Sequence, residues 1–120
     1  MTRRKKTFGE VLRKARDGRY SVRKFADLSG VSPTYLSQVE KGNVAPPTAE
    51  RVKVMAELLD ANPDEWTALA GRVPDDLPAI IQSHPVEMPA LIREAGELSD
   101  VQLQAVRKRI RKIVDGITSA

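Results

Sequence analysis

The chain has 120 residues, a formal net charge of +4 at pH 7 and 41% hydrophobic residues, but only 4% aromatic residues. This length fits one domain, or one small domain with an appendage, around a mainly aliphatic core. Because the sequence has no cysteine and a single histidine, His84, disulfides, iron–sulfur clusters and Cys- or His-rich metal sites are not expected. Neither a membrane span nor a secretory signal is expected, which fits a cytoplasmic protein.

Charge is distributed unevenly along the sequence. Residues 1–24 carry ten Lys or Arg and two acidic residues, whereas residues 57–100 carry two basic and ten acidic residues. The last 20 residues are basic again, with five basic residues and one acid. Such a chain can present one face to an anionic polymer such as nucleic acid, although the same charges could simply be solvated.

Residues 1–6 are short, basic and without a helix-capping signal. They predict a flexible arm that either contacts DNA phosphates or serves as a solubilising terminus. Its basic residues are Arg3, Arg4, Lys5 and Lys6.

A capping box at Thr7 and Glu10 opens the first predicted helix, which ends near Asp17-Gly18. Helical spacing assigns its inward face to Phe8, Val11, Leu12 and Ala15. The basic residues are expected on the outer side of this helix and in the loop after it, namely Arg13, Lys14, Arg16 and Arg19.

Residues 21–42, SVRKFADLSGVSPTYLSQVEKG, predict two short helices joined by a tight turn. Ser21 is a good N-cap, Gly30 can adopt positive φ at the turn, and Ser32-Pro33 starts the second helix. The residues expected to face inward are Val22, Phe25, Ala26, Leu28, Leu36 and Val39. The outer face of the second helix is short and polar, as the major groove of DNA requires.

This segment resembles the DNA-binding domain of the lambda-repressor-like family, of the Cro/C1 or XRE type. The resemblance covers roughly residues 8–70 and implies an all-α fold with a five-helix DNA-binding domain. It is carried by Leu12-Arg13, Phe25-Ala26, Gly30-Val31-Ser32, the run from Tyr35 to Glu40, and Gly42.

The resemblance implies that bases are read from the start and middle of the second helix of the pair, by Pro33, Thr34, Ser37 and Gln38. Gln38 is the best reader, because its amide can bond bidentately to adenine. Thr34 can form one hydrogen bond or offer its methyl group to thymine, and Pro33 can make only apolar contacts. The residues expected at phosphates are Ser21, Arg23, Lys24, Tyr35 and Asn43, with Arg3, Arg4, Lys5 and Lys6 of the arm.

One position departs from the family pattern. Where the family usually carries a glutamine that clamps a phosphate and braces the base-reading glutamine, this chain has Val22. The phosphate clamp must then come from the Ser21 backbone, Arg23, Lys24 or Asn43. Tyr35 could instead pack beside the first helix of the pair, and Glu40 is expected to bind nearby backbone or an arginine. With few base-reading groups, phosphate contacts and DNA shape should supply much of the affinity, which should fall steeply with salt.

Two further helices complete a predicted domain over residues 7–71. The fourth helix starts at Pro47 or Thr48, and the fifth starts at Asn62-Pro63 and stops at Gly71. Trp66, the only tryptophan, is expected to pack the fifth helix against the first.

Residues 72–120 predict a small helical extension. Two short amphipathic segments, whose junction is disturbed by Pro85 and Pro89, precede a helix that opens with a capping box at Ser99 and Gln102. Apolar residues of that helix repeat at heptad spacing: Leu103, Val106, Ile110, Ile113 and Ile117. This seam either folds back on the chain or meets its copy in a second subunit, and the small size of the extension favours the dimer.

These features predict a dimeric, sequence-specific transcription regulator, most simply a repressor that reads inverted-repeat half-sites of double-stranded DNA with residues 32–40. The alternative is an antitoxin or adaptor that binds a protein partner through residues 72–120 and uses DNA binding for autoregulation. No catalytic constellation, metal site or cofactor is expected. The clustered acids are more simply a solvated surface: Asp60, Asp64, Glu65, Asp75 and Asp76.

Overall fold

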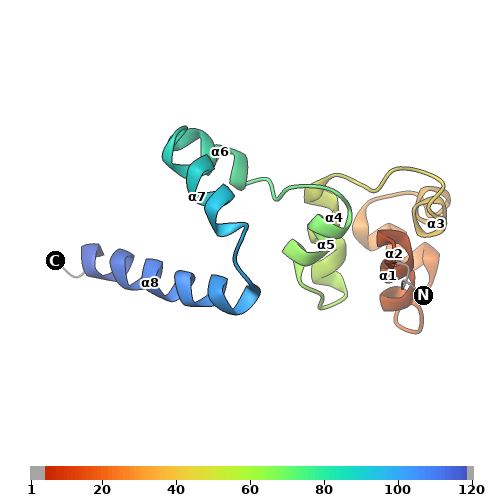
Figure 1. The fold of residues 1–120 in the computed structure, drawn as a ribbon. Helices are drawn as coiled ribbons and strands as arrows, with labels where there is room; N and C mark the ends of the chain where they lie inside the picture. The colour runs from red at the N-terminus through yellow and green to blue at the C-terminus, as the bar shows by residue number, and fades with distance from the viewer. Residues whose placement is uncertain (1–4, 119–120) are drawn as a thin grey trace, which may run out of the picture. The chain divides into compact units, whose positions relative to one another are not determined.

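The computed structural model describes residues 5–118, and in that range it contains helices and no strand (Figure 1). This confirms the all-α class. In chain order the helices are α1 (Phe8–Arg16), α2 (Val22–Ser29), α3 (Pro33–Lys41), α4 (Ala49–Leu58), α5 (Pro63–Leu69), α6 (Leu77–Ser83), α7 (Glu87–Ala95) and α8 (Asp100–Thr118). None of the described helices is long and apolar enough to cross a membrane.

The chain divides into two units, one ending at Leu77 and the other beginning at Pro78. The domain limits inferred from the sequence stay predictions. Residues 1–4 of the predicted arm, which include Arg3 and Arg4, lie outside the described residues.

Each helix of the first unit begins at a side-chain cap. The cap oxygen accepts a hydrogen bond from a backbone N–H in the first turn, and each such cap stabilises its helix by about 1 kcal/mol. The capping residues are Thr7, Ser21, Ser32, Thr48 and Asn62. At α1 the full capping box forms, because Glu10 also accepts from the Thr7 backbone N–H. The starts predicted for these five helices are therefore confirmed.

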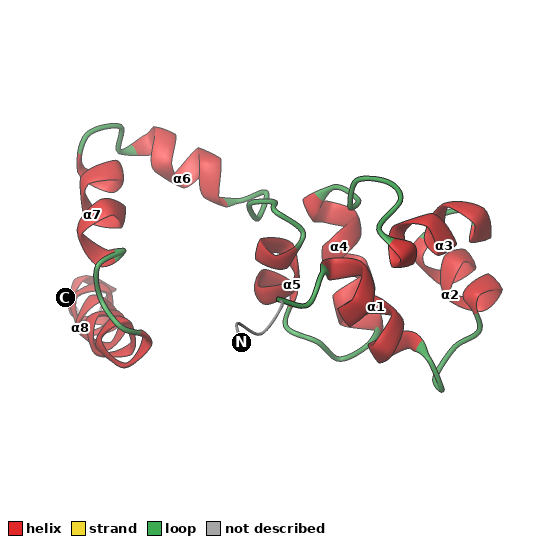
Figure 2. Cartoon of the chain, turned by 45° about the vertical axis from the view of Figure 1, so that its right-hand side comes forward, coloured by secondary structure: helices red, strands yellow, loops and turns green. Residues whose placement is uncertain are grey.

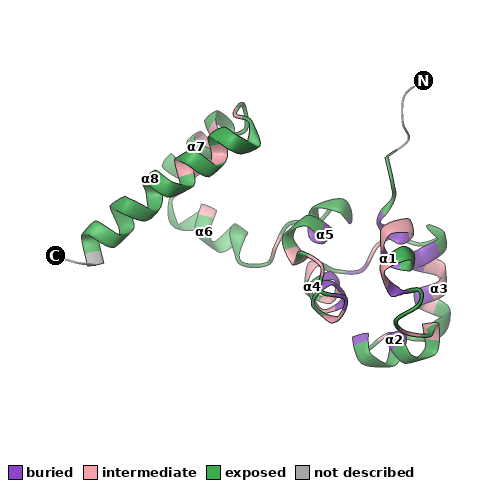
Figure 3. Cartoon of the chain, turned by 90° about the horizontal axis from the view of Figure 1, so that it is seen from below, coloured by how far each residue is buried: buried purple, intermediate pink, exposed green. Residues whose placement is uncertain are grey.

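The core lies within the first unit, where α3 packs on α1 and α2, and α4 packs on α2 and α5. Phe8 and Trp66 meet edge to face with ring centroids 6.0 Å apart, so Trp66 joins α5 to α1 as predicted. Figure 3 shows the buried residues in α1–α5 and the loops between them. The buried apolar residues are Phe8, Leu12, Phe25, Ala26, Leu36, Val39, Val52, Met55, Ala56, Leu59, Trp66 and Ala70.

The last turn of α2 differs from the sequence prediction. Leu28 is 42% exposed, and Ser29 is buried in its place. Residue 29 lies one turn after Phe25 on the same helix face. The Ser29 hydroxyl is satisfied there because it donates to the Phe25 carbonyl at 2.6 Å.

In the second unit, α7 and α8 are separate helices joined by a loop (Figure 2). The predicted capping box of α8 forms, with the Ser99 hydroxyl 3.2 Å from the Gln102 N–H. By contrast, α7 starts at Glu87 without a side-chain cap, in line with the disturbance expected between Pro85 and Pro89. From residue 71 to residue 117, the limits within which side chains are described there, no residue is buried.

Candidate nucleic-acid interface

The turn between α2 and α3 is fixed by backbone hydrogen bonds and by α4. Gly30 adopts φ 76°, in the left-handed region, and the Val31 N–H donates to the Ala26 carbonyl at 2.9 Å. The Arg51 guanidinium on α4 donates to the Ser29 carbonyl at 2.6 Å. The turn between α2 and α3 is therefore held by groups of α2, of the turn itself and of α4.

The predicted base-reading residues lie on the side of α3 away from the core. Leu36 and Val39 are buried, whereas Pro33 and Thr34 are exposed. Ser37 and Gln38 are half-buried. This segregation leaves the short polar face of α3 available to a ligand.

Asn43, predicted from sequence as a phosphate contact, is hydrogen-bonded to Gln38. Gly42 ends α3 with φ 76°, and the Asn43 N–H then donates to the Gln38 carbonyl at 3.0 Å. The Asn43 side-chain Nδ2 also donates to Gln38 Oε1 at 2.9 Å. The sequence analysis did not predict this bond. The only indication of it in the sequence is that Asn43 follows Gln38 by five residues, with the helix-ending Gly42 between them.

Arg16 was expected on the outer surface of α1, and this prediction is wrong. Its guanidinium is buried and donates to Glu40 on α3 through Nε at 2.5 Å and Nη2 at 2.9 Å. The hydrogen bonds to Glu40 raise the pKa of Arg16 above its ordinary value, although burial opposes this shift. Glu40 therefore binds an arginine, one of the two partners expected for it.

The spacing of Arg16 and Glu40 contains the signal for their burial. Arg16 follows the core residue Leu12 by four positions, and Glu40 follows Leu36 by four. Each charge therefore continues the inward face of its helix. Their bidentate contact fixes α3 against α1.

Gly9 allows α1 and α3 to approach closely. A Cβ atom at this position would lie 2.6 Å from the Glu40 carbonyl oxygen and closer still to the Val39 carbonyl oxygen. Both are backbone atoms of α3 and cannot rotate away. The sequence assigns no role to Gly9, because a glycine in the first turn of a helix does not indicate which other helix packs against it.

The predicted phosphate contacts differ in how free their side chains are. Arg23 and Lys24 are exposed in the first turn of α2, and Lys5 and Lys6 are exposed before α1. The Ser21 hydroxyl accepts from the Lys24 N–H at 3.1 Å, so Ser21 acts as the cap of α2. The Tyr35 ring packs partly buried against the core.

Three other basic residues, Arg13, Arg19 and Lys41, also differ in whether their side chains are already hydrogen-bonded. Arg13 and Lys41 are exposed and line a shallow hollow with Ser37 of α3. Arg19, in contrast, bonds to the Leu59 carbonyl at 3.0 Å and to the Asp60 carboxylate at 3.1 Å. Arg13 and Lys41 are therefore the better placed to meet an anion.

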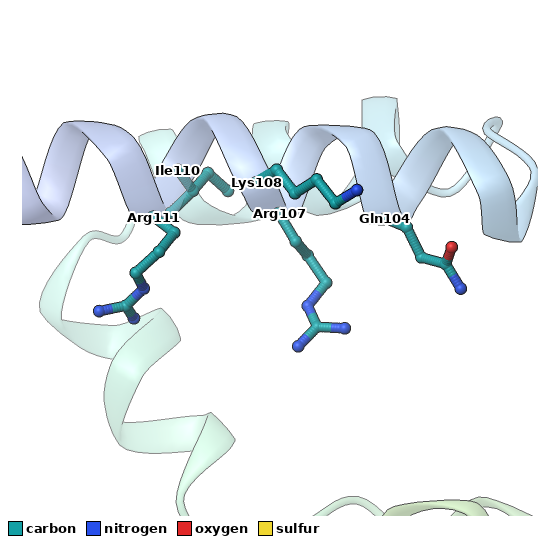
Figure 4. A pocket seen from close by; sticks show the side chains of 5 residues that line it. All are labelled: Gln104, Arg107, Lys108, Ile110 and Arg111. Atoms are coloured by element: carbon teal, nitrogen blue, oxygen red, sulfur yellow. The ribbon is translucent and has the colours of Figure 1, made fainter.

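The second unit carries its own basic surface on α8. The side chains of Gln104, Arg107 and Arg111 extend to one side of this helix (Figure 4). Arg111 also lies 3.6 Å from the Asp115 carboxylate. No group of three or more His, Asp or Glu side chains within the described residues is arranged to hold a metal ion.

Comparison with known proteins identifies one related family. Residues 12–66 match a family model described as helix-turn-helix. The match begins inside α1 and ends inside α5, so it includes α2, the turn and α3. No curated protein and no solved structure matches the chain.

Proposed function

We propose that the chain acts as a dimeric repressor, because the match of residues 12–66 to a helix-turn-helix model of the Cro/C1 type supports a DNA-binding transcription regulator. In this proposal α3 enters the major groove at each half-site of an inverted repeat. Thr34 and Gln38 read base edges, with Pro33 and Ser37 beside them.

The observation that carries the proposal is the division of α3 into two faces. Its inner face is fixed by Leu36, Val39 and the Arg16–Glu40 pair, and its outer face presents polar groups that can donate and accept hydrogen bonds. A helix held so firmly loses little freedom when it enters the groove, which favours binding.

Phosphate contacts would orient this helix on the duplex. Ser21 caps α2, whose first-turn amides suit an anion, and Arg23 and Lys24 are exposed at the same helix end. Tyr35, Asn43 and the basic residues before α1 would add contacts around the groove. Such contacts supply affinity with little dependence on base sequence.

Dimerisation is supported by the apolar side chains that the second unit leaves exposed. Ile110, Ile113 and Ile117 follow one another along α8 at heptad spacing and are 44%, 64% and 72% exposed. A second copy of the chain would present the same seam, and pairing would bury both. A segment of this size gains stability from a partner that completes its core.

The test is a comparison of wild type and Gln38→Ala on two kinds of duplex. A sequence selected by the wild-type protein from a random library serves as operator, and an unselected duplex serves as reference. We expect Gln38→Ala to weaken operator binding by about a hundredfold, because a dimer loses one bidentate base contact worth about tenfold in each half-site, and to leave reference binding nearly unchanged.

Equal loss on both duplexes would argue against base reading by Gln38. A footprint of the wild-type protein on the operator tests the proposed dimer, because a dimer is expected to protect two half-sites related by symmetry. A single protected half-site, together with a co-purifying protein bound through residues 72–120, would favour the antitoxin or adaptor alternative.

A further inference from the structure

We propose that Asn43 is a positioning residue that orients the Gln38 amide and thereby sets the base that α3 prefers. Asn43 acts here through Gln38 and not on the base itself. The inference rests on the proposed function, because it concerns the same helix on DNA.

The backbone holds Asn43 beside Gln38. Gly42 turns the chain in the left-handed conformation at the end of α3, and the Asn43 N–H bonds to the Gln38 carbonyl at 3.0 Å. With its backbone fixed in this way, Asn43 places its side-chain Nδ2 2.9 Å from Gln38 Oε1 by the choice of side-chain rotamer alone. The amide contact is therefore formed before DNA arrives.

The direction of the Gln38 amide follows from the way the two side chains face each other. Asn43 turns its Nδ2 toward Gln38, and because this group can only donate, the Gln38 oxygen faces it. The Gln38 Nε2 donors are then left for the groove, and one oxygen lone pair remains. Adenine offers an acceptor at N7 and a donor at N6, and this arrangement satisfies both.

Exposure also favours a positioning role over a structural one. Asn43 is exposed and Gln38 is half-buried, and neither belongs to the hydrophobic core. Removing the bond should therefore leave the fold intact and change mainly the population of Gln38 orientations. The second Nδ2 hydrogen of Asn43 remains able to donate to a phosphate.

The experiment uses full-length Asn43→Asp and Asn43→Ala variants and four duplexes based on the selected operator. The duplexes differ only at the base pair whose preference is lost in Gln38→Ala. The carboxylate introduced by Asn43→Asp can only accept, so it bonds to Gln38 Nε2 and turns the amide around. We expect Asn43→Asp to reduce the preference for adenine by about tenfold, and Asn43→Ala to reduce it by about threefold.

The ratio of affinities among the four duplexes is the readout, because the added charge of Asn43→Asp repels phosphates equally in all of them. In a Gln38→Ala background, neither change at residue 43 should alter the remaining base preference. Discrimination at the base pair read by Thr34 serves as an internal control and should not change. Without DNA, the side-chain NH2 resonances of Gln38 should shift in Asn43→Asp.

An unchanged adenine preference in both Asn43 variants would overturn the proposal, and a uniform loss of affinity would then identify Asn43 as a phosphate contact only. That result leaves base reading by Gln38 intact. If instead Gln38→Ala loses affinity equally on every duplex, base reading by Gln38 fails, and the positioning role fails with it. The two failures are therefore distinguishable.

Discussion

At the scale of single residues, the buried Arg16–Glu40 pair ties α3 to α1. Both side chains are less than a tenth exposed, and both guanidinium contacts go to the same carboxylate. Removing one partner leaves the other as an unpaired buried charge, which is far more costly than losing an exposed pair.

We expect Glu40→Ala to lower the free energy of unfolding by about 3–5 kcal/mol, because Arg16 then loses its partner inside the protein. Urea unfolding followed by circular dichroism measures the change. The matched control is Asp60→Asn, which removes the exposed ion pair with Arg19 and should lower stability by less than about 1 kcal/mol. Similar losses in the two variants would contradict the buried role of Glu40.

The helix caps could be predicted from the sequence because their role depends on near neighbours. Thr7, Ser21 and Ser32 were identified as caps because a cap acts on an amide three residues away. Arg16 was placed on the surface because its charge suggested solvent, and its partner lies 24 residues further along. The Asn43–Gln38 bond depends on the turn at Gly42, which helical periodicity does not describe.

At the scale of helices, the close approach of α1 and α3 depends on Gly9. The sequence predicted both helices and their inward faces, but not the distance between them, since that distance is set where two backbones meet. The polar face of α3 could be predicted because Leu36 and Val39 define its opposite side.

Gly9→Ala tests this contact. A new Cβ would force α3 away from α1, and we expect a net loss of about 1–2 kcal/mol in unfolding free energy after the better helix propensity of alanine is included. Operator affinity should fall as well, because α3 moves. Gly116→Ala is the matched control, as nothing lies within 4 Å of a Cβ at that position of α8. If both variants prove equally stable, the backbone contact does not limit the packing of these helices.

At the scale of the whole molecule, the two units differ in how they bury apolar surface. The first unit encloses its core within α1–α5, whereas the described side chains of the second unit leave Ile113 and Ile117 mostly exposed. The heptad spacing predicted this seam, because spacing along one helix is a local property of the sequence.

Charged substitutions in the seam test the dimer. We expect the full-length double variant Ile113→Glu with Ile117→Glu to sediment as a monomer, since pairing would place four carboxylates in an apolar interface. The control Val101→Glu adds one carboxylate per chain at a residue of α8 that is 75% exposed and outside the seam, and it should remain dimeric. Monomeric wild-type protein would refute the proposed dimer.

The confinement of the core to α1–α5 has a consequence for synthesis on the ribosome. Every described buried residue precedes Gly71, and the first unit ends at Leu77, so this unit takes no buried residue from the described residues that follow it. At about 5–20 residues per second, synthesis of residues 78–120 takes about 2–9 s, whereas small helical domains fold in about microseconds to milliseconds. The first unit can thus finish folding while α8 is still being made.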